Sequence, residues 1–234
     1  MKIFIKWFNK KPKKKVVLTP KINKNIFVSN HEKDINNIKP IKVIGVGGCG
    51  NNFINYLIDK NMEFASFVYA DTDKQCLQSS KASIVIQMKN EITCGLGSGG
   101  NCDIGQNAAK KSREEIKGTV CDTNTLFIAA GMGGGIGTGA APVIADIAKN
   151  YGIKVIAVVT MPFSFEGKVR LLQAELGVEK LRKACKKVII LQNDKLKNDD
   201  SSLVDAFDYQ RDKLKCLCEN EIVKMKTGRK EVRK

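Results

Sequence analysis

The sequence has little that would support a zinc site, a disulfide framework or a membrane span. Its 234 residues contain one histidine, His31, and its eight cysteines include no C-x-x-C pair. Zinc sites need closely spaced Cys or His ligands, so we expect no metal bound by protein side chains. We also expect the cysteines to be free thiols in a reducing compartment. No run approaches the ~18 apolar residues of a membrane-spanning helix. The composition, 43% hydrophobic and 27% charged, is typical of a soluble, core-forming chain.

Acidic residues are absent from residues 1–31, which carry nine lysines. Residues 213–234 add a net charge of +5, so the two ends hold 14 of the 16 net positive charges. Between them, residues 32–212 contain 23 basic and 21 acidic side chains. This nearly neutral body lacks the excess of basic residues that forms a phosphate-binding stripe, so we expect no nucleic-acid partner.

These shifts in charge predict three regions. Residues 1–39 are expected to form a disordered basic arm, residues 40–212 the folded domain, and residues 213–234 a basic tail containing an incomplete core helix. Within residues 1–15, an alternative is a weak contact with a membrane surface, because one face of a short helix there would carry Ile3, Phe4, Trp7 and Phe8. The basic leader also fits an organelle transit peptide loosely.

From residue 40 onward, short β-branched apolar runs alternate with helical stretches. This pattern predicts an α/β fold, a Rossmann-like and mostly parallel sheet with helices on both faces. Six strands are expected, at residues 41–46, 66–70, 82–87, 125–130, 153–160 and 188–192. Helices are expected at residues 52–60, 104–117, 139–151 and 168–187, with a last one from about residue 203.

Three glycine clusters stand beside the predicted strands and helices: GVGGCGNN at 45–52, GLGSGGN at 95–101 and GMGGGIGTGAAP at 131–142. Open α/β sheets bind ligands at the carboxyl ends of their strands, where helix N-termini offer free N–H groups to phosphate. None of the clusters ends in G-K-[ST], so we expect a triphosphate cradle built from amides, without the lysine of a P-loop.

Two alternatives stay open at this point. The first cluster also satisfies G-x-G-x-x-G, with Asp71 about twenty residues later, so an NAD-binding domain competes. After the fifth strand, Glu166 would suit ribose hydroxyls and Arg170 a phosphate or base edge. The same two residues are also spaced as an ordinary i,i+4 surface pair.

Six motifs in order resemble the nucleotide-binding domain of the tubulin/FtsZ family of GTPases: IKVIGVGGCGNN, ADTD, GLGSGGN, GMGGGIGTGAAP, TMPFSFEG and QNDKL. The resemblance covers residues 41–207. It implies binding of GTP or GDP with Mg²⁺, and head-to-tail assembly with a complete FtsZ-type subunit in a cell-division filament. It also implies a bacterial type of cytoplasm, with the plastid stroma as the alternative.

The resemblance also implies the nucleotide site. Its residues would be Gly47, Gly48, Cys49, Gly50, Asn51, Asn52, Asp71, Gly97, Ser98, Gly99, Gly100, Gly134, Gly135, Ile136, Gly137, Thr138, Glu166, Arg170, Asn193, Phe207 and Arg211. The glycine-rich residues would hold the phosphates, Glu166 and Arg170 would meet the ribose and nearby groups, and Asn193 with Phe207 would address guanine.

Three of these residues depart from the family pattern. Ile136 replaces a threonine, which removes a hydroxyl donor and is expected to weaken binding by roughly 1 kcal/mol. Asp71 replaces an asparagine and brings an acid near the phosphates. Arg211 stands where an aspartate or asparagine usually reads the base, with Asp212 adjacent as a substitute.

The family's acidic catalytic loop has no match before Lys234. We therefore expect no catalytic residue in this sequence, and GTP hydrolysis that depends on an acidic loop from a complete partner subunit. The alternatives are a non-catalytic capping or regulatory paralogue and a decayed, truncated member of the family.

Overall fold

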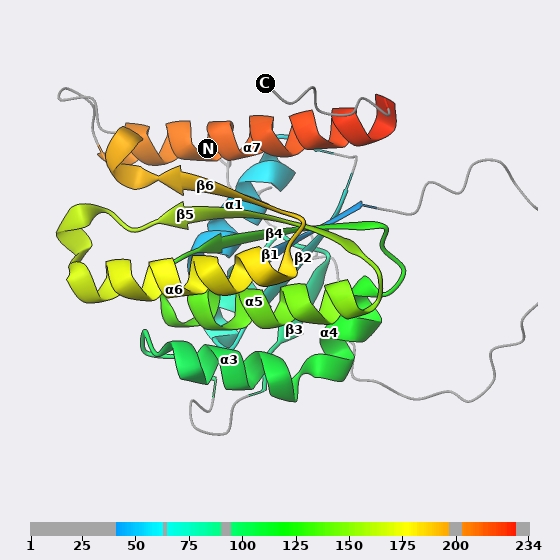
Figure 1. Ribbon diagram of the computed structural model, residues 1–234, viewed down its shortest axis with the longest axis horizontal. Coiled ribbons are helices and arrows are strands. Elements are labelled where there is room, and N and C mark those ends of the chain that lie inside the picture. The colour runs from blue at the N-terminus through cyan, green and yellow to red at the C-terminus, as the bar shows by residue number, and fades with distance from the viewer. Residues whose placement is uncertain (1–40, 63–64, 90–94, 197–202, 228–234) are drawn as a thin grey trace, which may run out of the picture. The chain divides into compact units, whose positions relative to one another are not determined.

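The computed structural model describes residues 41–62, 65–89, 95–196 and 203–227. All of them belong to the unit Asp34–Lys234, so the predicted arm and its membrane contact lie outside the described residues. Six parallel strands form one sheet in the order β3-β2-β1-β4-β5-β6 (Figure 1). The strands are β1 (Ile41–Val46), β2 (Ser66–Asp71), β3 (Ile84–Gln87), β4 (Thr125–Gly131), β5 (Lys154–Met161) and β6 (Lys187–Gln192).

Seven α-helices and two short 3-10 helices connect and follow the strands in the described part of the chain. They are α1 (Gly47–Asp59), α2 (Lys74–Ser79), α3 (Cys102–Lys111), α4 (Arg113–Val120), α5 (Gly135–Asn150), η1 (Ser164–Glu166), α6 (Lys168–Ala184), η2 (Asn193–Leu196) and α7 (Leu203–Thr227). The predicted α/β class, a parallel sheet with helices, is confirmed.

Both faces of the sheet are buried because alternate strand residues enter two separate cores. On β1, Ile44 and Val46 pack with α3, α4, α5 and α6. Ile41 and Val43 point the other way and pack with α1, α2 and α7. Helix layers on both sides explain why the strands read as continuous apolar runs rather than as an alternating pattern.

Helix α7 passes through residue 212, the expected end of the domain. Leu214, Cys218 and Ile222 lie beyond that point, and all three are buried in the core that α1 shares with the sheet. Their 4-residue spacing places them on one face of the helix. The segment from 213 to 227 is therefore part of the packed domain.

The main differences from the expected elements concern glycine and short helices. The expected helix at 104–117 is two helices, because Ser112 ends α3 and precedes α4. Helix α2, which Asp73 caps through its side chain, was not predicted. Helices α1 and α5 begin five and four residues earlier than expected, at Gly47 and Gly135. The low helix propensity of glycine hid these first turns.

In the described part of the chain, no helix is both long enough and apolar enough to cross a membrane.

Candidate functional site

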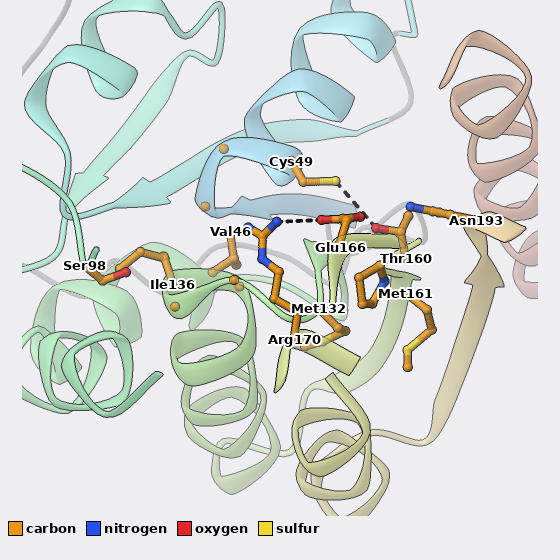
Figure 2. A pocket seen from close by; sticks show the side chains of 17 residues that line it. Val46, Cys49, Ser98, Met132, Ile136, Thr160, Met161, Glu166, Arg170 and Asn193 are labelled. Atoms are coloured by element: carbon orange, nitrogen blue, oxygen red, sulfur yellow. Dashed lines mark hydrogen bonds and ion pairs between the residues drawn. The ribbon is translucent and has the colours of Figure 1, made fainter. Parts of the chain in front are cut away.

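A cavity of about 380 Å³ opens at the carboxyl ends of β1, β4 and β5 (Figure 2). This volume is within the range of small-molecule sites, roughly 300 to 1,000 Å³. In Figure 2, Ser98 and Ile136 lie at one end of the cavity, Asn193 at the other, and Glu166 with Arg170 between them. The cavity therefore has the extent and the place expected for a ligand of an open α/β sheet.

Two helix N-termini meet at the cavity. Helix α1 begins at Gly47 and α5 at Gly135, and both residues line it. Their N-cap residues, Val46 and Gly134, make no side-chain capping hydrogen bond. The first N–H groups of the two helices are thus left for a ligand, and the positive ends of both helix dipoles favour an anion.

The glycines at the cavity serve two different purposes. A Cβ added at Gly48 or Gly134 would meet nothing within 4 Å, so these positions leave open space above the main chain. A Cβ at Gly50 would lie 2.6 Å from the carbonyl oxygen of Ala129, which means that this glycine lets α1 pack tightly on β4. Gly47 has a φ of +73°, a backbone conformation that side chains rarely adopt.

Among the residues that line the cavity, the charged side chains are Glu166 and Arg170, which pair with each other. The Nη1 of Arg170 donates to Oε2 of Glu166 over 2.6 Å. The backbone N–H of Phe163 donates to the other carboxylate oxygen over 2.8 Å. The pair is thus the i,i+4 contact expected as an alternative, and it also faces the cavity. Since no lysine is among the described residues that line it, the cavity would hold an anion mainly through main-chain amides.

Hydrogen bonds between Ser164 and Asp194, which we call the clasp, join the two segments at the Asn193 end of the cavity. Both carboxylate oxygens of Asp194 accept from the backbone N–H of Ser164, at 3.0 and 3.2 Å. The Ser164 hydroxyl donates to the same carboxylate over 3.2 Å. Ser164 begins η1, which carries Glu166, and Asp194 follows Asn193 in η2. The clasp therefore fixes Glu166 and Asn193 relative to each other.

Cys49 lies on the floor of the cavity. The residue as a whole is exposed, but its sulfur is 3.7 Å from the Thr160 hydroxyl and close to Gly131. Loss of water around the sulfur raises the pKa of the Cys49 thiol, more than the hydrogen bond with Thr160 lowers it. The thiol is consequently neutral at pH 7 and puts no negative charge beside a bound anion.

The cavity brings together about half of the predicted site residues. Those that line it are Gly47, Gly48, Cys49, Ser98, Gly134, Gly135, Ile136, Gly137, Glu166, Arg170 and Asn193. Six further lining residues were not predicted: Val46, Gly131, Met132, Thr160, Met161 and Pro162. Several of these end β1, β4 or β5, so the rule that parallel sheets bind ligands at the carboxyl ends of strands was the signal that could have found them.

Nine of the other predicted residues lie outside the lining. They are Gly50, Asn51, Asn52, Asp71, Gly97, Gly99, Gly100, Thr138 and Arg211. Asn51 is buried, and its side-chain oxygen has no partner within the described residues. The Thr138 hydroxyl accepts from the backbone N–H of Gly133 over 2.8 Å, which holds the loop before α5 in place. Phe207 is in α7, and its side chain lies outside the described residues.

Arg211 and Asp212 both contact Tyr56 on α1. The guanidinium carbon of Arg211 is 5.4 Å from the centre of the Tyr56 ring, and the Tyr56 hydroxyl donates to Asp212. This hydrogen bond raises the pKa of Tyr56 to about 12. In this structure the two residues connect α7 to α1 rather than line the cavity.

Asp71 is buried at the end of β2 and is held by three donors. Tyr69 donates its hydroxyl to Oδ2, and the backbone N–H groups of Thr72 and Asp73 donate to Oδ1. Burial nevertheless raises the pKa of the Asp71 carboxyl above its ordinary value. The native state therefore binds a proton more tightly here than the unfolded chain does, so ionisation of Asp71 costs stability as the pH rises.

An Asp71→Asn variant is expected to gain stability relative to the natural chain as the pH rises from about 4 to 8, because the amide accepts the same two N–H groups and never ionises. The difference between the two free energies of unfolding should grow with pH and then level off. Urea unfolding of both chains across this range measures it. Parallel pH profiles would contradict the expectation.

Comparison with known proteins places this chain in a family. A family model described as the GTPase domain of the tubulin/FtsZ family matches residues 40–200. The chain belongs to the tubulin/FtsZ family. A cell division protein FtsZ of Buchnera aphidicola subsp. Baizongia pistaciae (strain Bp) is 45% identical over 185 residues, which cover 78% of this chain and 48% of that protein. The chain thus spans about half the length of the curated relative it matches.

Solved structures agree with the family. An empty FtsZ dimer from M. jannaschii aligns with a TM-score of 0.72 and 43% identity, over 75% of this chain and 52% of the M. jannaschii chain. CetZ2 from Haloferax volcanii, a GTPγS-bound protofilament, aligns with a TM-score of 0.65 over 74% of this chain and 55% of its own. At 22% identity, the CetZ2 likeness supports the fold alone. The resemblance to FtsZ expected from the motifs is confirmed.

Proposed function

We propose that the cavity binds GTP and GDP and that the chain acts as an FtsZ-like cell-division GTPase subunit. The observation that carries the proposal is the meeting of two uncapped helix N-termini and the open glycines Gly48 and Gly134 at one cavity. Phosphate oxygens need N–H donors and close approach to the main chain, and both are present. An NAD-binding domain of the Rossmann type would use only the first of the two helix N-termini.

The other end of the cavity suits a nucleoside. Asn193 is 6% exposed and lines the cavity, and an amide side chain both donates and accepts, as a base edge requires. Glu166 keeps free lone pairs for ribose hydroxyls although each of its oxygens already accepts a hydrogen bond. We therefore propose that the phosphates lie over α1 and α5 and the nucleoside lies toward Asn193.

Magnesium would be held chiefly by the nucleotide. Over the described ranges, no group of three or more His, Cys, Asp or Glu side chains could hold a metal ion. Mg²⁺ commonly keeps several water ligands and binds through substrate phosphates, so such a site is compatible with this cavity. When bound, the ion supplies positive charge to the phosphates, which the amide cradle and Arg170 alone offer only in part.

Isothermal titration of the full chain with GTP, GDP, ATP and NAD, with and without Mg²⁺, tests the proposal. We expect micromolar binding of GTP and GDP, at least tenfold weaker binding of ATP, and tighter GTP binding with Mg²⁺. Absence of guanine-nucleotide binding by a chain that unfolds cooperatively would overturn the proposal. Binding of NAD in its place would revive the dinucleotide interpretation.

Hydrolysis is proposed to need a group from outside the described residues. Among the described residues that line the cavity, Glu166 is the one that carries a carboxylate, and it is paired with Arg170. A residue that orients the attacking water contributes strongly to phosphoryl transfer. We propose that an acidic loop of a complete FtsZ-type subunit supplies it through head-to-tail contact, in the bacterial type of cytoplasm expected above.

Mixing the chain with a complete FtsZ separates this proposal from the capping alternative. Phosphate release above the sum of the two separate rates is expected if the chain receives a neighbour's acid. A rate below that of the complete FtsZ alone would instead favour a subunit that caps filament ends. An unchanged rate would contradict both functions.

Nucleotide is expected to protect Cys49 from alkylation. Its sulfur lies on the cavity floor, so a bound phosphate would block a maleimide reagent, while the exposed Cys121 and Cys216 lie elsewhere. Because the pKa of the Cys49 thiol is raised, labelling should be slow even without nucleotide. Peptide mass spectrometry after timed labelling at pH 7 should show at least a tenfold slowing at Cys49 and no change at the other two. Equal labelling with and without GTP would argue against this position of the phosphates.

A further inference from the structure

Exposed large apolar side chains gather on one short segment of the surface. Nine such residues occur in the described ranges, and five of them fall between residues 165 and 176. Their exposed fractions are 61% for Phe165, 70% for Val169, 36% for Leu171, 59% for Leu172 and 59% for Leu176. Single exposed apolar residues are ordinary, but a contiguous group of this kind marks an interaction surface.

Three of the five residues lie on one side of α6. Val169, Leu172 and Leu176 are separated by three and four residues, the spacing of a coiled-coil seam, and together with Phe165, in η1 just before the helix, we call them the α6 seam. Phe165 also stacks on Phe163 and directly precedes the helix. The opposite side of α6 is buried against the sheet and α5 through Ala174, Val178 and Leu181. Helix α6 is thus apolar on both sides, and among the described residues only one side is covered (Figure 1).

We propose that the α6 seam is the contact between two copies of this chain, paired as antiparallel helices about a two-fold axis. In the register where Val169 faces Leu172 of the second copy, Leu176 lies beside the start of α6 of the second copy, next to the segment that carries Phe165. The two-fold axis repeats both contacts, so the same patch on each copy covers its counterpart on the other copy. This interface lies on the side of α6 away from the core, and Val169, Leu172 and Leu176 do not line the cavity.

The charges beside the seam favour this arrangement. Lys168 and Glu175 are both exposed and both precede a seam residue by one position. In the antiparallel register, Lys168 lies beside Glu175 of the second copy, and the symmetry makes this opposite-charge pair twice. The two helix dipoles also oppose each other.

A parallel pairing is disfavoured by the second half of the helix. Continuing the seam spacing beyond Leu176 reaches Glu179 and Lys183, which are exposed. In a parallel pair, each would face the same residue of the second copy, so like charges would meet at both positions. In the antiparallel register, Glu179 and Lys183 lie beyond the end of the contact between the two helices.

Sedimentation velocity on the full chain, without nucleotide and with EDTA, tests the pairing across a range of protein concentrations. We expect a reversible monomer–dimer equilibrium. Leu172→Glu should raise the dimer dissociation constant at least tenfold, because it places a carboxylate in the middle of the seam. Val223→Glu, a change at an exposed apolar position of α7, is the matched control and should leave it unchanged. Both variants should bind GTP as the natural chain does, since neither residue lines the cavity.

A charge exchange tests the register. Lys168→Glu alone and Glu175→Lys alone should each weaken the dimer severalfold, and the double variant should restore it. A chain that stays monomeric at every concentration, or a dimer that Leu172→Glu leaves intact, would overturn the proposal. Failure of the double variant to restore a dimer that both single variants weaken would overturn the antiparallel register.

Discussion

Replacement of Gly48 with alanine is expected to remove most nucleotide binding while leaving the fold intact. The added methyl group meets no protein atom within 4 Å, so nothing in the domain has to move. It would stand above the first turn of α1, where the proposed phosphates approach the main chain. We expect GTP affinity to fall by roughly 30-fold, about 2 kcal/mol. Because alanine favours helix more than glycine does, the free energy of unfolding should be unchanged or slightly higher.

Gly50→Ala is the matched control, the same methyl group two residues along α1. Here the Cβ would lie 2.6 Å from the Ala129 carbonyl oxygen and 2.8 Å from the carbonyl carbon of Gly45. Helix α1 would have to move away from β1 and β4, and such overpacking costs about 1–3 kcal/mol or more. Urea unfolding and GTP titration of both variants should therefore show that Gly48 leaves room for the nucleotide, whereas Gly50 allows α1 to pack closely on the sheet. Equal GTP affinity in the natural chain and Gly48→Ala would place the phosphates elsewhere.

Loss of the clasp between the two loops is the second large effect that we expect. Asp194→Ala removes the acceptor of three hydrogen bonds from Ser164. The segment that carries Glu166 would then no longer be tied to Asn193. Because Asp194 is exposed, water replaces part of the lost interaction. We expect GTP affinity to fall about tenfold, or about 1.4 kcal/mol, with little change in the free energy of unfolding.

Ser164→Ala tests whether the clasp acts mainly through the main chain. This variant loses the hydroxyl contact but keeps the backbone N–H that donates to Asp194 at 3.0 and 3.2 Å. Its GTP affinity should change less than about threefold, since a single exposed hydrogen bond is worth little. Asp194→Asn, which retains one acceptor oxygen, should lie between the two. A loss of affinity in Ser164→Ala as large as that in Asp194→Ala would show that the hydroxyl is the important group.

The sheet could be predicted almost completely from the sequence because each strand is a short apolar run between turn residues. Strand β1 was expected at 41–46 and is found there. The other strands differ from their expected bounds by one or two residues. Two layers of helices bury both faces, so the strands have no alternation to misread, and hydrophobicity alone marks them.

The glycine-rich turns were harder to predict because tertiary contacts override the low helix propensity of glycine. The segment 135–138 reads as a loop, yet it is the first turn of α5. A Cβ at Gly137 would collide with the carbonyl of Gly131, and one at Gly139 with that of Cys102. The glycines are thus needed for close packing, and only the three-dimensional contacts reveal this.

The cavity lining and the contacts of Arg211 differ in how far the sequence could predict them. The motifs predicted that Glu166, Arg170 and Asn193 lie near one another, and all three line the cavity because each follows a strand that ends at the same edge of the sheet. The side-chain contacts of Arg211 could not be predicted from a motif. It stacks on Tyr56, a residue more than 150 positions away in the sequence, and no local pattern signals that contact.

The amide cradle has a consequence for how this protein tolerates mutation. Every residue but proline carries the same backbone N–H, so no loss of a side chain can remove a donor from the first turns of α1 and α5. Inactivating substitutions at these turns would have to add atoms, as at Gly48 or Gly134. Alanine in place of a larger side chain at these two turns would therefore leave the donors intact, whereas alanine in place of Gly48 or Gly134 would fill the space above the main chain.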